Sequence, residues 1–423
     1  MIRAAALALA LALPVAAPAE APVRTGQGAL ADGALWKATV PANWNGTLLL
    51  WSHGYARTMP DAADAPDRYR AELLAAGYAL AGSTYATPGW AVESAVPDQL
   101  ATLDAFRARY GAPKRVIAWG NSMGGLVTTA IAEHDPRRVD GALALCGSIG
   151  GAVGMMNMAL DGAYAFRTLI APDAGIRLTR IDDDAENARR VAAALARAQA
   201  SPEGRARVAL AAVLAGLPGW TTPSDARPGT ADYAAQEAQM AKTFVMGVFL
   251  PRVDQERRAG GGFSWNTGID YRHQLARSGR EEMVRALYDA AGLDLDADLA
   301  RLDAGERVAA DPTAVAYMMQ NYTPDAMPHV PLLAVQNIGD GLTSPSLQRA
   351  YLEASARRAP GVTAGLWVAG AGHCTFSAET VLASLHHLEA RLDSGDWPAR
   401  PAGFIDASPA PMLRPCVRGG ACE

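Results

Sequence analysis

A glycine-rich turn between a predicted buried strand and a predicted helix constrains this chain most. Residues 120–125 read GNSMGG; they follow the apolar run 115–119 and precede the helical run 126–134. Glycines on both sides allow a tight turn and close packing of the helix, so that the serine between them projects from the sheet edge. A serine hydroxyl is a good nucleophile only beside a base and near donors that stabilise an oxyanion. The motif therefore predicts an α/β fold with Ser122 as nucleophile.

The chain on both sides of this turn alternates short β-rich runs with helical runs. This rhythm is typical of a mostly parallel sheet that is flanked by helices. A hairpin is expected at residues 27–40, turning at Asp32-Gly33. The other expected strands are residues 46–52, 78–84, 115–119, 141–146, 330–336 and 363–368. The expected helices around them are residues 68–76, 97–110, 345–358 and 378–392.

The rhythm stops between Ile149 and about Met327, where no good strand pattern occurs. Helices are expected in this stretch at residues 182–200, 203–215, 230–249, 281–291 and 312–322. A structureless loop of this length is improbable in a compact domain, so we expect a helical cap domain at residues 149–326, inserted after the sixth core strand. Residues 20–148 and 327–405 then form one discontinuous α/β catalytic domain, and residues 406–423 form a C-terminal tail.

A second polar loop follows the predicted strand at residues 46–52. It reads Trp51-Ser52-His53-Gly54-Tyr55, and in such folds a loop at this place donates a backbone N–H to the oxyanion. We assign the two oxyanion donors to the backbone N–H groups of Tyr55 and Met123. His53 is expected to shape the loop by hydrogen bonding. It precedes the serine, whereas the base of this fold follows the serine in the chain.

The base and the acid are expected at the ends of the last two predicted strands. Asp340 lies in the loop 337–345, and His373 ends the segment 370–373. An imidazole that takes a proton from serine needs a carboxylate to fix its tautomer and to stabilise the imidazolium. Asp340 and His373 follow Ser122 in the expected order, so these three residues are the predicted triad. Asp325 and Glu379 are weaker candidates for the acid.

These motifs together resemble the α/β-hydrolase superfamily, specifically its capped esterases, lipases and peptidases. The resemblance covers the chain before and after the predicted cap and does not extend into the cap. It implies a mostly parallel central sheet flanked by helices, and it carries the roles of nucleophile, base and acid over to Ser122, His373 and Asp340.

An apolar substrate pocket is expected between the cap and the sheet. Residues 149–160 contain Met155 and Met156, whose flexible thioethers suit an adaptable pocket, although ordinary core packing explains them equally well. His53 and Trp265 are further candidates for the pocket wall. The remaining aromatic candidates are Trp90, Phe244, Phe249 and Phe263. Such a wall favours a substrate with an apolar or aromatic moiety.

The first residues resemble a secretory signal. Arg3 precedes the apolar run 4–13, which is too short to span a bilayer, and Ala17-Pro18-Ala19 fits a cleavage site. We therefore expect a signal peptide at residues 1–19 and a secreted or periplasmic enzyme; a retained N-terminal anchor is the alternative. An oxidising compartment favours disulfides among the four cysteines. The expected pairs are Cys146–Cys374 and Cys416–Cys422, and the alternative joins the tail to Cys374.

Composition excludes several classes of partner. The net charge of −5 and the pI near 5.9 argue against nucleic acid, and no later segment predicts stable membrane insertion. Residues 294–298 begin like a calcium loop, but Leu299 stands where glycine is required, so a helix start is expected there. We expect neither a metal nor a cofactor. The oligomeric state is left open by the sequence.

The sequence thus favours a serine hydrolase that cleaves small-molecule or oligomeric carboxylic esters through an acyl-enzyme. An aminopeptidase or tripeptidyl-type peptidase of the same fold is the alternative, because those enzymes share the triad and the cap. Such a peptidase needs a carboxylate in the cap that binds a free α-amine; the candidates are Asp161, Asp173, Glu237 and Asp270. A non-catalytic binding protein of this fold would be expected to lack a triad member.

Overall fold

The computed structural model describes residues 23–422. The predicted signal peptide lies outside this range. Within it, eight strands form a single sheet in the order β1-β2-β4-β3-β5-β6-β7-β8. The strands are β1 (Arg24–Ala29), β2 (Leu35–Val40), β3 (Thr47–Ser52), β4 (Ala79–Ser83), β5 (Arg115–Asn121), β6 (Gly141–Leu145), β7 (Leu332–Gly339) and β8 (Thr363–Ala371). β2 is antiparallel to both β1 and β4, and all other neighbours are parallel. This is the predicted α/β-hydrolase fold.

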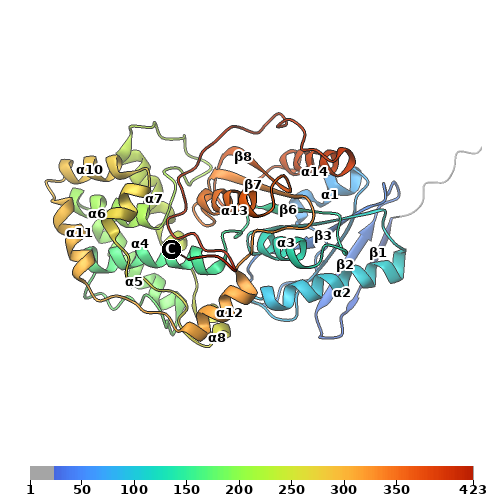
Figure 1. Ribbon diagram of the computed structural model, residues 1–423, viewed down its shortest axis with the longest axis horizontal. Helices are drawn as coiled ribbons and strands as arrows, with labels where there is room; N and C mark the ends of the chain where they lie inside the picture. The colour runs from blue at the N-terminus through green and yellow to red at the C-terminus, as the bar shows by residue number, and fades with distance from the viewer. Residues whose placement is uncertain (1–22, 423) are drawn as a thin grey trace, which may run out of the picture.

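Helices cover both faces of the sheet (Figure 1). They are α1 (Asp67–Ala75), α2 (Val92–Tyr110), α3 (Met123–His134), α13 (Pro345–Arg358) and α14 (Ala378–Ser394). Successive side chains of a strand point to opposite faces, and β3 shows the result. Leu48 and Leu50 pack in the core that contains Phe106 of α2, whereas Leu49 packs in the core that contains Leu385 of α14. Because both faces are covered, the middle of the strand, residues 48–51, is apolar.

The start of α2 corrects one expectation. The helix begins at Val92, not at Pro97, and Pro97 lies inside it. Proline lacks an N–H and therefore cannot donate an intrahelical hydrogen bond, which is why the sequence suggested a helix start there. Buried Val92 and Ala95 pack the additional turn against the core, and tertiary contacts outweigh the local penalty.

Nine helices of the described chain lie between β6 and β7, and we call this segment the helical insert. They are α4 (Ala152–Ile170), α5 (Asp184–Ala198), α6 (Pro202–Leu214), α7 (Tyr233–Val248), α8 (Val253–Ala259), α9 (Tyr271–Arg277), α10 (Glu281–Ala290), α11 (Leu295–Ala304) and α12 (Pro312–Tyr322). Most of them gather beyond one end of the sheet, at the left of Figure 1. They surround a hydrophobic core of their own, with Phe166, Leu210 and Phe244 among its fully buried members.

The C-terminal segment after α14 runs back across the sheet domain to the insert (Figure 1). Its last described residues lie against α12, where Cys422 Sγ is 3.9 Å from Met319 Sδ. Arg414 is fully buried and pairs with Asp161 of α4 at 2.9 Å. A disulfide between Cys416 and Cys422 closes a short loop in this segment. In the described range, we find no helix that is both long and apolar enough to cross a membrane.

Candidate active site

Ser122 occupies a strained turn between β5 and α3. Its φ of 59° lies in the left-handed region that non-glycine residues rarely adopt. The flanking glycines leave no room for a side chain: a Cβ on Gly120 would lie 2.4 Å from the Gly124 carbonyl oxygen, and a Cβ on Gly124 would lie 2.0 Å from the Ser52 oxygen. The GNSMGG sequence therefore permits the tight turn from β5 into α3, with Ser122 between the two elements.

The loop after β3 lies directly against this serine. A Cβ on Gly54 would come within 3.3 Å of the Ser122 Cβ and 3.8 Å of its Oγ. Tyr55, the predicted oxyanion donor, follows at once and lines the same cavity as Ser122. Met123, the other predicted donor, is the first residue of α3. The chain thus brings both residues close to Ser122, as the predicted oxyanion hole requires.

His53 is held away from a catalytic role by the main chain. Its Nδ1 lies 2.6 Å from the Gly54 carbonyl oxygen, and its Nε2 lies 3.1 Å from that of Thr84. The ring also stacks on Tyr85 at 3.9 Å between centroids. Burial lowers the pKa of His53, so the neutral form is favoured. Since both nitrogens face carbonyl oxygens, neither is placed to receive a proton from serine, and the ring supports the loop instead.

Asp340 and His373 meet at the ends of β7 and β8. The Nδ1 of His373 lies 2.9 Å from Asp340 Oδ2, and Asp340 is fully buried. The register of these two parallel strands shifts between Asn337 and Gly339, and the shift brings Gly339 opposite Ala371. An imidazole that donates its Nδ1 proton to a carboxylate keeps the Nε2 lone pair as the base. The pair therefore has the orientation that a general base needs.

The loop around Asp340 fixes its carboxylate with further hydrogen bonds. The backbone N–H groups of Leu342 and Thr343 donate to Oδ1 at 2.9 and 3.1 Å. The Thr343 hydroxyl oxygen lies 2.9 Å from Oδ2 and 3.2 Å from His373 Nδ1. These contacts satisfy a buried carboxylate that would otherwise be costly, and they hold it in place for the imidazole.

A disulfide joins the loops next to the serine and the histidine. Cys146, which follows β6, is bonded to Cys374, with their Cα atoms 5.4 Å apart. The Ser122 N–H donates to the Leu145 carbonyl oxygen at 3.1 Å, so the serine turn and Cys146 are adjacent. Cys374 Sγ lies 3.4 Å from His373 Nε2. Of the pairings that the sequence left open, the structure contains Cys146–Cys374 and Cys416–Cys422.

A cavity of about 300 Å³ opens above Ser122, and its wall is mainly apolar. The sheet domain contributes Tyr55, Arg57, Trp90, Ser122, Leu342 and Thr343 to this catalytic cavity, and the insert contributes Ser148, Met155, Asp184, Ala185, Ala188, Val245, Met246, Phe249, Leu250 and Pro251. The expected pocket residue Met155 and the aromatic candidates Trp90 and Phe249 are on this wall.

Three expected pocket residues lie elsewhere. His53 supports the loop as described above, and Met156 is fully buried in the core. Trp265 lies against the Arg414 guanidinium, 5.6 Å from the ring centroid. Of the further aromatic candidates, Phe244 and Phe263 are also buried in the core. The sequence did not identify Val245 and Met246, although their apolar side chains near the end of α7 form a helical pattern with Phe249.

The four carboxylates that a peptidase might use also lie away from this cavity. Asp161 pairs with Arg414, and Glu237 accepts a hydrogen bond from Gln199 at 2.7 Å. Asp270 caps α9. None of the four is on the wall that the structure describes. The carboxylate that does lie there is Asp184, which accepts N–H bonds from Arg252 and Val253 at 2.9 and 3.3 Å.

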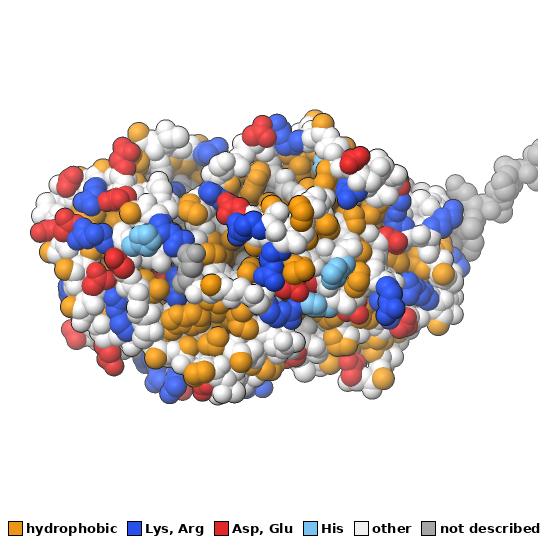
Figure 2. All heavy atoms as spheres, in the orientation of Figure 1, with side chains coloured by type: hydrophobic (Ala, Val, Ile, Leu, Met, Phe, Trp, Pro, Cys, Tyr) orange, Lys and Arg blue, Asp and Glu red, His pale blue; other side chains and the backbone are white. Residues whose placement is uncertain are grey.

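Charges of both signs are distributed over the surface. Figure 2 shows basic and acidic side chains interspersed over the visible face, with hydrophobic side chains between them. Many of the charged groups are paired, among them Arg138 with Asp104 and Arg189 with Glu186.

The sheet order, the serine turn and the Asp340–His373 pair define a serine hydrolase of the α/β-hydrolase fold. No family model matches the chain. A curated protein, the o-phthalyl amidase of Xanthobacter agilis, is 31% identical over 414 residues, which cover 90% of each chain. The present chain belongs to the same family as that amidase.

Two solved structures are similar to this chain in fold. An esterase from Aspergillus oryzae is 12% identical, with a TM-score of 0.44, over 89% of this chain and 81% of the other. An esterase from Pyrococcus furiosus is 11% identical, with a TM-score of 0.40, over 89% and 92% of the two chains.

Proposed function

We propose that this protein is an exported serine hydrolase that cleaves carboxylic esters and amides of an aromatic acyl group. The observation that carries this proposal is the 2.9 Å contact between buried Asp340 and His373, at the sheet edge where Ser122 opens onto an apolar cavity. The proposed cleavage of amides is supported by the family relation to an enzyme that is named an o-phthalyl amidase. The sequence alone favoured esters.

The reaction proceeds in two halves through an acyl-enzyme. Ser122 Oγ attacks the carbonyl carbon while His373 Nε2 takes the hydroxyl proton, and the N–H groups of Tyr55 and Met123 stabilise the oxyanion. His373 then gives the proton to the leaving alcohol or amine, and the acyl group stays on Ser122. Water, deprotonated by His373, attacks the ester, and its collapse releases the acid and restores Ser122. Asp340 stabilises the imidazolium in both halves.

The helical insert acts as the cap of this site. Its segments after β6 and around α4, α5 and α7 supply more than half of the residues that line the catalytic cavity. A cavity of about 300 Å³ with aromatic and aliphatic walls fits one ring better than a peptide chain. Closing such a wall over the substrate excludes water and strengthens the interactions of the oxyanion.

Arg57 is the residue that we propose for recognition of a carboxylate on the acyl group. It is exposed at the catalytic cavity, and among the described residues no carboxylate lies within ion-pair distance of it. A phthalyl group is an aromatic acyl group with a second carboxyl function, and a guanidinium binds carboxylates through paired hydrogen bonds. Arg57 thus gives the cavity a cation for the second carboxyl function of a phthalyl group, which is the group in the relative's name.

Export is supported by the two disulfides, since such bonds persist in oxidising compartments. The predicted signal peptide agrees with this location. The purified mature chain would therefore be prepared under oxidising conditions.

A four-substrate assay tests the proposed function. The chain is given an o-phthalyl anilide, the matching benzoyl anilide, p-nitrophenyl benzoate and alanine p-nitroanilide. We expect turnover of the aromatic ester and of at least one aromatic amide, with little turnover of the amino-acid anilide. Preferred cleavage of the amino-acid anilide would instead establish the peptidase alternative, and no turnover of any substrate would contradict the proposal.

A further inference from the structure

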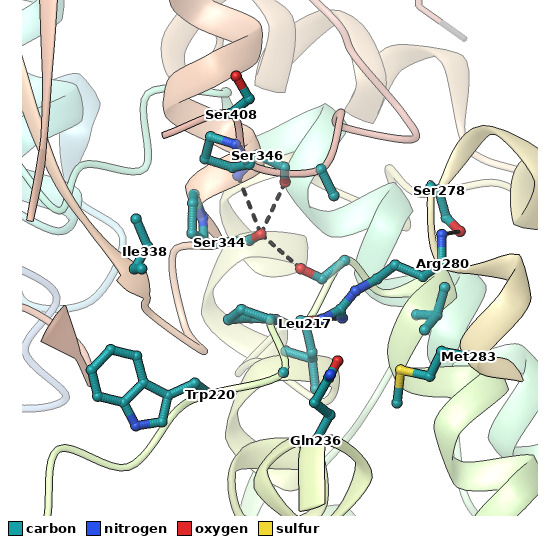
Figure 3. Close-up of a pocket in the computed structure, with 18 of the residues that line it drawn as sticks. Leu217, Trp220, Gln236, Ser278, Arg280, Met283, Ile338, Ser344, Ser346 and Ser408 are labelled. Atoms are coloured by element: carbon teal, nitrogen blue, oxygen red, sulfur yellow. Dashed lines mark hydrogen bonds between the residues drawn. The ribbon is translucent and has the colours of Figure 1, made fainter. Parts of the chain in front are cut away.

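A second cavity, of about 560 Å³, lies between the insert, the loop after β7 and the C-terminal segment. Leu217, Trp220 and Met283 line it from the insert, Ile338 from the end of β7 and Ser344 from the loop after β7 (Figure 3). Ile405 lines it from the C-terminal segment. It shares no lining residue with the cavity above Ser122. The proposed reaction therefore leaves this second cavity without a role.

The charged group that distinguishes this cavity is the Arg280 guanidinium. Its Nη1 donates to the Leu217 carbonyl oxygen at 2.6 Å. No carboxylate of the described chain lies within ion-pair distance of it. Figure 3 shows the side chain extending from the start of α10 toward Leu217, along the cavity. Burial lowers the pKa of Arg280 to about 10, yet the group stays charged at neutral pH. Arg280 is half-buried, and a charge that is partly removed from water and has no counter-ion is costly, so an anion at this place would stabilise it.

The acidic residues on the wall, Glu282 and Asp406, form no ion pair with Arg280. Asp406 pairs with Arg400 at 2.9 Å. Arg227 adds a second, exposed guanidinium at the rim. Within the described chain, the Arg280 guanidinium therefore has a carbonyl oxygen as its partner and no carboxylate.

The rest of the wall indicates what kind of anion fits. One part of the wall, formed by Leu217, Trp220, Met283 and Ile338, presents hydrocarbon and an indole ring, against which an apolar body can pack. The rest of the wall is polar and includes Gln236 and several serines. The Arg280 Nη1 already donates to the Leu217 carbonyl oxygen. The Nη2 and Nε of the same planar guanidinium can then donate to the two oxygens of one carboxylate.

We propose that this cavity is a second ligand site, which binds a small carboxylic acid with an aromatic or aliphatic body. The carboxylate lies on Arg280, and the body packs between the insert and the C-terminal segment. This site is separate from the proposed catalytic function and stands if that function is wrong. We call it the Arg280 site.

Titration calorimetry with benzoate on the full mature chain tests the Arg280 site. We expect wild-type protein to bind benzoate and Arg280→Gln to bind it at least about tenfold more weakly, the loss of a charge-assisted pair. Arg280→Lys should retain part of the affinity. Benzamide, which has the same ring and no charge, should bind far more weakly than benzoate.

Two matched variants locate the bound benzoate. Arg301→Gln removes an exposed positive charge from α11, outside the cavity, and should leave the affinity unchanged. Arg57→Gln removes the cation at the catalytic cavity and should also preserve binding at the Arg280 site. Affinity that falls with Arg57→Gln and not with Arg280→Gln would place benzoate above Ser122 and overturn the proposal, as would absence of binding to the wild-type chain.

A variant on the opposite wall keeps the proposal testable if Arg280→Gln fails to fold. Ile405 reaches the cavity from the C-terminal segment, where its N–H donates to the Trp367 carbonyl oxygen at 2.9 Å. Ile405→Trp keeps that backbone bond and fills space in the cavity, so it should weaken benzoate binding by steric exclusion while Arg280 remains. Unchanged benzoate affinity in folded Ile405→Trp would contradict the proposed position of the ligand body.

Discussion

Cys146 and Cys374 connect the loop that supports Ser122 to the residue that follows His373. The Thr343 hydroxyl oxygen lies 2.9 Å from the Cys146 carbonyl oxygen and 2.9 Å from Asp340 Oδ2. One covalent bond and one hydroxyl therefore hold the Ser122 turn, the Asp340 loop and the His373 loop at a common edge of the sheet.

Removing this disulfide should lower activity before it unfolds the protein. The bond closes a loop over 228 positions, and losing such a bond costs about 2–5 kcal/mol. We expect Cys146→Ala/Cys374→Ala to have a reduced Tm and a reduced kcat at a temperature where circular dichroism shows it folded. The control is Cys416→Ala/Cys422→Ala, whose bond spans 6 positions and should affect kcat little. Equal kcat in wild type and the first double variant would contradict the positioning role.

Ser122→Ala should lower kcat by about 10⁴-fold or more and leave the fold intact. The change removes the attacking oxygen and leaves the turn unaltered. Steady-state hydrolysis of p-nitrophenyl benzoate measures it, with exposed Ser224→Ala as the control that should match wild type. Wild-type turnover by Ser122→Ala would show that Ser122 is not the nucleophile.

Asp340→Asn tests the acid separately from the fold. An amide at this position no longer fixes the imidazole tautomer or stabilises the imidazolium, and a loss of about 10⁴-fold in kcat is expected by comparison with the aspartate of serine proteases. Asp325→Asn and Glu379→Gln change the two alternative acids and should retain most of the activity. A severe loss in either of these variants, with an active Asp340→Asn, would reassign the acid.

Arg57→Gln should discriminate between acyl groups. We expect kcat/KM for the o-phthalyl anilide to fall about tenfold or more, because a charge-assisted contact with its carboxylate is lost. The benzoyl anilide lacks that carboxylate and should be hydrolysed as by wild type. Parallel losses for both substrates would mean that Arg57 acts on the cavity as a whole.

Glu133 makes stability depend on pH. Burial and the neighbouring Asp325 raise its pKa from 4.5 to about 8. A group whose pKa is raised by folding contributes stability that is fully present below its unfolded pKa and is lost as pH rises through the folded value. The Tm should therefore decline between about pH 4.5 and pH 8, and less steeply in Glu133→Gln. Scanning calorimetry at several pH values compares the two slopes; identical slopes would show that other groups dominate.

The elements that carry the predicted triad were found from the sequence because their signals are local. A buried strand followed by a glycine-flanked serine needs only neighbouring residues to be recognised, and the same holds for the loops that contain Asp340 and His373. The order of these loops in the chain then predicts which sheet edge they share. The sequence also suggested the two disulfide pairs, since both loops with Cys146 and Cys374 follow strands of the same sheet.

The elements that were missed depend on tertiary packing. α4 is buried over almost its whole length, so it has no polar face and no clear helical periodicity. Val245 and Met246 line the catalytic cavity only because α7 lies above Ser122, which no local pattern reveals. Met156 and Trp265 resembled pocket residues by type alone, and the fold directs them into the core and toward Arg414.

The Asp161–Arg414 pair has a consequence for biosynthesis. Its two residues are 253 positions apart, and both are shielded from water. Asp161 gains this counter-charge only after the rest of the insert, β7, β8 and α14 have been synthesised, because Arg414 follows all of them in the chain. The insert therefore completes its interior only when the C-terminal segment reaches it, and a chain truncated just before Arg414 would leave the buried Asp161 carboxylate with the Tyr271 hydroxyl at 3.2 Å and without this cation.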